Sequence, residues 1–180
     1  MKPIVINTQP ILFQLTEDFT SLLKQHISKQ FNTSVIIASP LNNNQLPVNL
    51  FDKSRKQWKS DKVLLWLLDK NKPNEGNKIL AICDFDAYSD CLNFVFGQAQ
   101  IDGRVSAIYL PRLRQEFYGL KPDKSLFYQR IVKEAIHELG HAFSLKHCNN
   151  PRCVMHFSNS LPDKDIKQNR FCDFCRTKIR

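Results

Sequence analysis

The chain has 180 residues, the size of one ordinary domain, of which 42% are hydrophobic and 24% charged. Lys and Arg outnumber Asp and Glu by 26 to 17, which gives a formal net charge of +9. No stretch approaches the roughly 18 apolar residues of a membrane span, and the first residues lack a signal peptide's long apolar run. We therefore expect a cytoplasmic protein with no membrane contact.

The basic charge raises the question of nucleic-acid binding, because phosphate backbones attract Lys and Arg. The positive residues are scattered along the chain and form no block of about five or six like charges. Residues 144–180 carry eight Lys or Arg and three Asp, so more than half of the excess lies in this tail. The pattern favours dispersed surface charge over a nucleic-acid interface.

Strand-like and helix-like segments alternate through the first half of the chain. Apolar spacing separates the two kinds, and Thr16 is a plausible N-cap for the first helix. The predicted elements are, in chain order, a strand at 3–6, a helix at 17–30, a strand at 34–38, an Asn-rich loop at 41–50, a helix at 61–69 and a strand at 78–83.

The second half begins with two strand-like runs, at 92–96 and 105–109, on either side of a turn signal at 102–103. This arrangement predicts a hairpin-like pair. Asp123 could then cap a long helix from 124 to about 143. Strands interleaved with helices predict an α/β or α+β fold in a single layered domain.

The long helix contains the motif H-E-x-x-H, formed by His137, Glu138 and His141. Residues at i and i+4 share a helix face, so two imidazoles can ligate one Zn²⁺. Glu138 is rotated by about 100° from His137, which lets its carboxylate reach a water on the metal and act as general base. By itself the motif also occurs by chance in long helices.

His147 follows six residues after His141 and completes the spacing H-E-x-x-H-x5-H. A third ligand at this distance requires the chain to leave the helix and turn back. Metzincins place a glycine of positive φ at that turn, where this chain has Ser144, at a cost of about 1–2 kcal/mol. We expect the turn to form, with catalytic efficiency less certain.

Four of the six cysteines lie in the last 33 residues as C-x4-C and C-x2-C. Paired spacing of this kind favours a structural zinc on four thiolates over disulfides. The four predicted ligands are Cys148, Cys153, Cys172 and Cys175. Cys83 and Cys91 are expected to be small core residues, and Phe171 and Phe174 to pack around this zinc.

Together with Met155, these histidines and cysteines resemble the archaemetzincin family of zinc metallopeptidases. Segments around Arg55, Phe94 and Arg112 extend the resemblance from about residue 50 onward. It implies a compact metzincin-like α/β domain with a mixed twisted sheet and a zinc-binding active-site helix. A small zinc-stabilised part at 148–180 would follow the part at 1–147.

The resemblance also implies two zinc ions per chain. His137, His141 and His147 would hold the catalytic zinc, and the four cysteines the structural one. Glu138 would be the general base and acid, and Met155 would form the Met-turn beneath the metal. Ser144 departs from the family's pattern, and so does a spacer after Met155 that is about one residue shorter.

The sequence thus predicts a monomeric zinc metallopeptidase that acts on a peptide or protein substrate. We expect the substrate strand to pair with an exposed sheet edge within 93–110. Two alternatives stay open at this point. One is a catalytically silent pseudo-enzyme that binds zinc and peptides, and the other is a basic zinc-knuckle module that binds nucleic acid.

Overall fold

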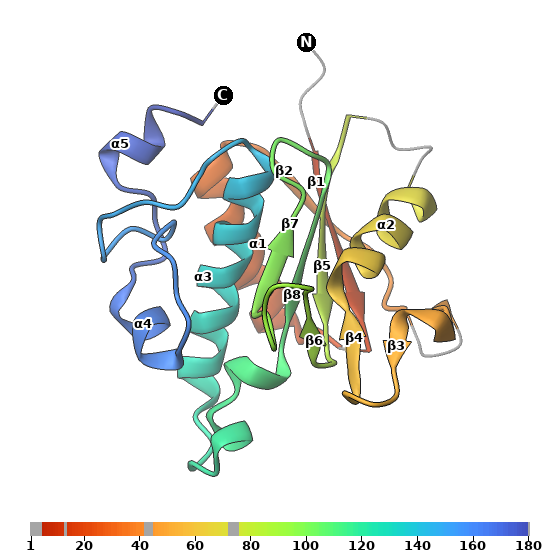
Figure 1. The fold of residues 1–180 in the computed structure, drawn as a ribbon. Helices are drawn as coiled ribbons and strands as arrows, with labels where there is room; N and C mark the ends of the chain where they lie inside the picture. Colours follow the sequence, from red (N-terminus) through yellow and green to blue (C-terminus); the bar gives the residue numbers. More distant parts are fainter. Residues whose placement is uncertain (1–4, 13, 42–44, 72–75, 180) are drawn as a thin grey trace.

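The computed structural model describes residues 5–12, 14–41, 45–71 and 76–179. Its centre is a five-stranded sheet in which only the edge strand β7 runs antiparallel to its neighbour (Figure 1). In spatial order the strands are β2 (Ser34–Ile37), β1 (Val5–Ile11), β5 (Lys78–Cys83), β8 (Val105–Tyr109) and β7 (Gly97–Ala99).

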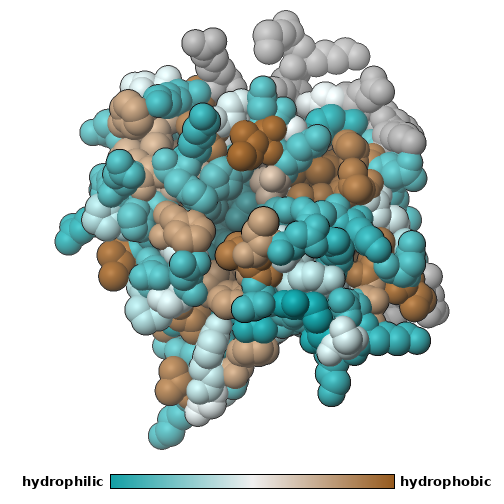
Figure 2. Space-filling view, in the orientation of Figure 1, coloured by the Kyte–Doolittle hydropathy of each residue, from teal (hydrophilic) through white to brown (hydrophobic). Residues whose placement is uncertain are grey.

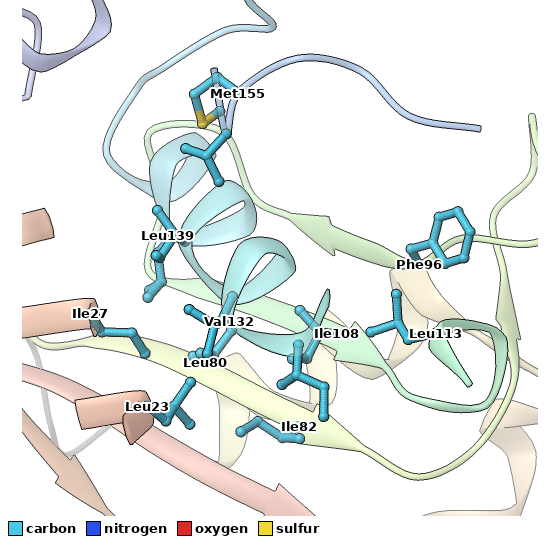
Figure 3. Packing of buried hydrophobic residues seen from close by; sticks show 14 of the residues in the cluster. Leu23, Ile27, Leu80, Ile82, Phe96, Ile108, Leu113, Val132, Leu139 and Met155 are labelled. Carbon is cyan, nitrogen blue, oxygen red and sulfur yellow. The ribbon is translucent and has the colours of Figure 1, made fainter. Parts of the chain in front are cut away.

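Helices cover both faces of this sheet. Helices α1 (Glu17–Phe31) and α3 (Lys124–Ala142) lie on one face, and α2 (Ser60–Lys70) lies on the other. Strand β5 is an almost unbroken apolar run because its side chains alternate between the two cores. Figure 3 shows Leu80 and Ile82 facing α1 and α3, whereas Ile79, Ala81 and Cys83 pack with α2.

A small second sheet lies beside α2 and supports a segment that leads to the edge strand. It contains β3 (Phe51–Asp52), β4 (Gln57–Lys59) and β6 (Ala87–Tyr88). The Gln57 amide donates to Asp86 and to the carbonyl of Asn93, each at 3.0 Å. Arg112 forms a bidentate pair with the same Asp86, at 2.7 and 2.8 Å. This network holds residues 89–96 in place.

The α/β class predicted from the sequence is confirmed. The predicted strand at 78–83 has the observed bounds, and the three main helices begin and end within one residue of the expected positions. Both expected caps are present, since Thr16 accepts from the Phe19 amide at 3.4 Å and Asp123 from the Leu126 amide at 2.8 Å. The first strand begins at Val5, and its expected start at residues 3–4 lies outside the described residues.

The expected strand at 92–96 is wrong, because the strand that pairs with β8 is β7. Val95 and Phe96 are consecutive and both buried, and they enter different cores on opposite sides of the sheet. Such alternation also occurs in strands, but the Val95 amide donates to the Ala87 carbonyl at 3.0 Å and not to β8. Within the expected substrate edge at 93–110, β7 is the edge strand, whereas β8 is paired on both sides.

Residues after α3 form mainly turns, with the short helices α4 (Leu161–Ile166) and α5 (Asp173–Arg176). Two minor predictions fail here and upstream. Cys91 is exposed, because it lies in a surface turn, and Phe174 has 65% of its surface exposed although Phe171 is buried. No helix among the described residues has the length and apolarity needed to cross a bilayer.

Candidate active site

The last turns of α3 carry the H-E-x-x-H motif in a buried setting. His137, Glu138 and His141 are all buried, and they lie on the part of the helix that faces β7 and the C-terminal segment. The helix can present polar groups here because its other positions, including Ala135 and Leu139, fill the core. His147 reaches the same place from the chain that follows the helix.

The three histidine side chains converge as the spacing predicted. One ligand nitrogen from each lies within 4.8 Å of the others, and Nε2 of His137 is 3.1 Å from Nε2 of His141. The Nδ1 of His137 faces the Val154 carbonyl at 2.8 Å, and the Nδ1 of His141 faces the Leu145 carbonyl at 2.7 Å. Carbonyls accept only, so both Nδ1 atoms carry the proton.

This tautomer leaves two Nε2 lone pairs facing each other at 3.1 Å, an arrangement that a cation between them would stabilise. Burial also lowers the pKa of His137, His141 and His147, which keeps the rings neutral at pH 7 and able to ligate a metal. The donor set therefore fits Zn²⁺, which accepts three histidines and keeps a fourth position open in catalytic sites.

Ser144 forms the turn that returns His147 to the site. Its φ is 69°, so the position has the left-handed backbone that the sequence predicted. Its hydroxyl donates to the Asp102 carboxylate, while the Asp102 amide donates to the His141 carbonyl at 3.0 Å. These bonds tie the turn to the β7–β8 connection and offset part of the backbone strain.

Glu138 lies against the edge strand. A Cβ placed on Gly97 would be 2.6 Å from Cγ of Glu138, so β7 can come this close only because residue 97 is glycine. Burial, and then the neighbouring Glu134, raises the pKa of Glu138 well above its usual range, while Lys164 and Lys167 oppose this rise. A carboxylate in this state binds a proton readily, as a general base must.

Met155 packs against α3 at Gly140, within the H-E-x-x-H motif. It is fully buried, and a Cβ on Gly140 would be 2.4 Å from its sulfur. Figure 3 shows Met155 above the helix, at the top of the core that contains Leu139. Its carbonyl accepts from the Cys148 amide at 2.9 Å, which joins Met155 to the cysteine segment.

The four C-terminal cysteines form a second cluster. Their sulfurs all lie within 4.8 Å of one another, and Sγ of Cys148 is 3.8 Å from Sγ of Cys172. A disulfide requires about 2.05 Å, whereas the edge of a tetrahedron with Zn–S bonds of about 2.3 Å is about 3.8 Å. All four are free thiols, so their chemistry and spacing fit a structural zinc.

A cleft of about 760 Å³ opens in front of the histidines, between β7 with the segment before it and the residues after Met155. Sequence reasoning missed part of its wall, because no motif marks Glu134, Lys164 or Lys167. The only sequence signal was their position. Glu134 lies one helical turn before Glu138 on α3, and Lys164 and Lys167 follow the predicted Met-turn. His156 is half-buried, and its Nδ1 contacts the Cys148 carbonyl at 2.9 Å.

Comparison with known proteins identifies the family. The profile described as Peptidase family M54 matches residues 45–180, which is three quarters of the chain. The chain belongs to peptidase family M54. An archaemetzincin of Methanocaldococcus jannaschii is 39% identical over 170 residues, covering 94% of this chain and 92% of the relative. Because the chain belongs to this family and is similar to this relative over most of its length, it is a zinc metallopeptidase.

Solved structures agree with this M54 assignment. A zinc-dependent peptidase from Methanocorpusculum labreanum superposes with a TM-score of 0.84 at 30% identity, covering 97% of this chain and 100% of that one. The archaemetzincin from Archaeoglobus fulgidus, solved in complex with malonate, gives a TM-score of 0.79 at 33% identity, with coverage of 98% and 100%. The metzincin-like architecture expected from the resemblance is therefore confirmed.

Proposed function

We propose that the histidine site hydrolyses peptide bonds, with Glu138 as the group that moves the proton. The observation that carries this proposal is the placement of a buried carboxylate beside three converging imidazoles, at the wall of an open cleft. His137, His141 and His147 would hold the catalytic zinc. Cys148, Cys153, Cys172 and Cys175 would hold a second, structural zinc.

Bound Zn²⁺ would supply a Lewis acid that polarises the scissile carbonyl and lowers the pKa of a coordinated water. Glu138 accepts a proton from the water while the oxygen of that water bonds to the carbonyl carbon. Glu138 then donates that proton to the leaving nitrogen as the C–N bond breaks. The products are a carboxylic acid and an amine, so atoms and charge balance.

The backbone of β7 supports the binding half of this proposal. It is the edge strand of the main sheet and lines the cleft next to Glu138. An extended substrate that added to this edge would hold one of its carbonyls at a fixed register relative to the histidines. Gly97 would let that substrate and Glu138 come close without steric conflict.

Exchange of Glu138 for Gln tests the mechanism, because it keeps the shape and removes the base. We expect peptide-library cleavage to fall by at least about a thousandfold, while elemental analysis still finds two zinc ions per chain. Glu116→Gln is the matched control, since Glu116 is exposed on a surface turn and should change neither quantity.

Exchange of His141 for Ala tests the metal assignment separately. The zinc content should fall from two ions to one, because the cysteine cluster keeps its own ion. A wild-type protein that binds two zinc ions and cleaves no peptide would instead indicate the pseudo-enzyme. One zinc per wild-type chain would contradict the two-site assignment. Salt-dependent binding of DNA or RNA, unchanged by Glu138→Gln, would favour the zinc-knuckle module.

A further inference from the structure

One wall of the cleft is lined by buried cations that the proposed chemistry does not use. Lys164 and Lys167 each have only 2% of their surface exposed, although lysines are rarely buried without a partner. Lys164 is neutralised, because its ammonium pairs with Glu134 and lies 4.3 Å above the ring of Phe96. The pair fixes this wall of the cleft.

Lys167 has no such partner. Its ammonium donates to the His156 carbonyl at 2.9 Å, and within the described part of the chain no carboxylate forms an ion pair with it. Burial lowers its pKa to about 8, so most molecules still carry the charge at pH 7. A buried ammonium with a single neutral acceptor is costly, and an anion would offset that cost.

Ser158 provides a second, independent sign of a ligand. Ser158 lines the same cleft, and its hydroxyl oxygen is shielded from solvent and has no hydrogen-bond partner within the described residues. A hydroxyl in this situation can donate to an oxygen anion. We call the part of the cleft formed by Glu134, Ser158, Lys164 and Lys167 the cationic recess.

The charges that line the cleft do not cancel within the protein. The cleft is lined by Lys146, Lys164 and Lys167 and by Glu134 and Glu138, so one positive charge remains even with both carboxylates ionised, and the proposed catalytic zinc would add to it. Lys146 is exposed, whereas Lys167 is buried and shielded from salt. Among the buried groups, Lys164 and Lys167 balance Glu134 and Glu138 in charge, but Lys167 forms an ion pair with neither carboxylate in the described part of the chain. Lys167 is therefore the buried cation that a ligand could pair with.

We propose that the cationic recess binds a carboxylate of the peptide substrate, with Lys167 supplying the charge and Ser158 a hydrogen bond. This inference rests on the proposed peptidase function. Glu138 donates to the leaving nitrogen, and Glu134 lies one helical turn from it, so the carboxylate belongs to the half of the substrate on the C-terminal side of the cleaved bond. This carboxylate is either an Asp or Glu side chain of the substrate or the substrate's own C-terminal carboxylate.

Matched peptides test the inference and separate the two sources. The two peptides of the first pair are long and differ only in having Glu or Gln directly after the cleaved bond. The two peptides of the second pair end at the residue that follows the cleaved bond, one with a free C-terminus and the other with an amidated one. We expect the wild type to prefer the carboxylate by at least about tenfold in kcat/KM for one of these pairs. The pair that shows the preference identifies the source.

Lys167→Met should reduce that preference to about one, and Lys167→Arg should retain most of it. Because the preference is a ratio within one protein, partial unfolding of a variant does not change it. Lys146→Met is the matched control, since it removes an equal charge from the exposed mouth of the same cleft and should leave the ratio within about twofold. The inactive Glu138→Gln protein should show the same preference in peptide affinity.

The outcomes distinguish the two proposals. If the wild type cleaves no peptide of either pair or of a wider library, the proposed function fails. If it cleaves peptides but treats Glu and Gln alike, and free and amidated ends alike, the function stands and the cationic recess has no such role. An unchanged ratio in Lys167→Met would likewise overturn the role of Lys167.

Discussion

At the scale of single residues, the approach of β7 to the catalytic helix depends on a missing side chain. We predict that Gly97→Ala lowers kcat/KM by about a hundredfold, because the added Cβ would lie 2.6 Å from Cγ and 2.7 Å from Oε1 of Glu138 and displace its carboxylate. Zinc content should stay at the wild-type value, since no histidine moves. Steady-state kinetics and elemental analysis measure the two effects.

Gly103→Ala is the matched control for that change. The three atoms nearest its added Cβ would all belong to the exposed side chain of Gln100, which can move away at little cost. Activity close to wild type is expected there. Wild-type kinetics in Gly97→Ala would mean that Glu138 tolerates displacement, and it would weaken the assignment of this carboxylate as the base.

Ser144 combines a strained backbone with a compensating hydrogen bond, and two substitutions separate them. Ser144→Ala keeps φ near 69° and loses the bond to Asp102, so we expect it to lower the free energy of unfolding by about 1 kcal/mol. Ser144→Gly loses the same bond and relieves about 1–2 kcal/mol of strain, less the added chain entropy of glycine.

The free energy of unfolding of Ser144→Gly should therefore be within about 1 kcal/mol of the wild-type value and higher than that of Ser144→Ala. Denaturant unfolding of the zinc-loaded proteins measures all three values. An alanine variant as stable as the wild type would show that the contact with Asp102 contributes nothing. Serine at this position then would be a plain loss relative to glycine, as the sequence pattern alone suggested.

At the scale of elements, local patterns predicted what they physically determine. Helix α3 has helical spacing and a capping aspartate, and β5 is a short apolar run between turn signals, so both were found within one residue. Strand β7 was misplaced because Gly97 and Ala99 have low strand propensity. Its pairing with β8 and the burial of Val95 and Phe96 in two cores are tertiary effects.

The candidate site divides in the same way. Metal ligands have fixed chemistry and spacing, so three histidines and four cysteines could be predicted from the sequence and lie together in the structure. Lys164 and Lys167 follow the Met-turn in a segment that looks like an ordinary polar helix. Their burial against α3 depends on long-range packing, which no local pattern reports.

Docking of α4 onto α3 depends on an ion pair that can be tested. Asp165 binds the guanidinium of Arg130 through two bonds of 2.8 and 2.6 Å, and the Arg130 side chain is 4% exposed while that of Asp165 is 33% exposed. We expect Asp165→Asn to destabilise the fold by about 1–2 kcal/mol, since it leaves a buried guanidinium without its counter-charge.

Asp90→Asn provides the comparison for that measurement. Asp90 pairs with Lys59 at 2.7 Å, but its side chain is 68% exposed, and such surface pairs contribute about 0–1 kcal/mol. Thermal unfolding of both variants shows which of the two ion pairs contributes more to the stability of the protein. Equal small effects would mean that the Arg130 pair is not needed to hold α4, and that other contacts of the helix with α3 position the cationic recess.

At the scale of the whole molecule, the main sheet positions α3, and the short segment from Cys148 to Met155 packs against the part of α3 that carries the histidines. In the orientation of Figure 1, Figure 2 shows a surface that is largely hydrophilic, with apolar residues in separate groups. The segment from Cys148 to Met155 begins next to His147, and its Val154 carbonyl orients His137. The histidine cluster and the cysteine cluster therefore share one piece of chain.

This shared segment predicts that loss of the cysteine cluster weakens the histidine site. Cys175→Ser removes one buried thiol of the proposed structural zinc site, so that zinc should be lost and the Val154 carbonyl should no longer be held against Nδ1 of His137. Removing such an outer partner of a histidine ligand typically weakens metal binding by about 10–100-fold, and we expect a change of that size in the affinity of the catalytic zinc.

Competition with a chelating dye measures that affinity, and peptide cleavage at saturating zinc reports the functional loss. Cys91→Ser is the matched control, because Cys91 is an exposed thiol outside both clusters and its removal should leave affinity and melting temperature unchanged. A Cys175→Ser protein that holds its remaining zinc as tightly as the wild type would show that the clusters act independently. The cysteine cluster would then stabilise the last 33 residues without contributing to catalysis.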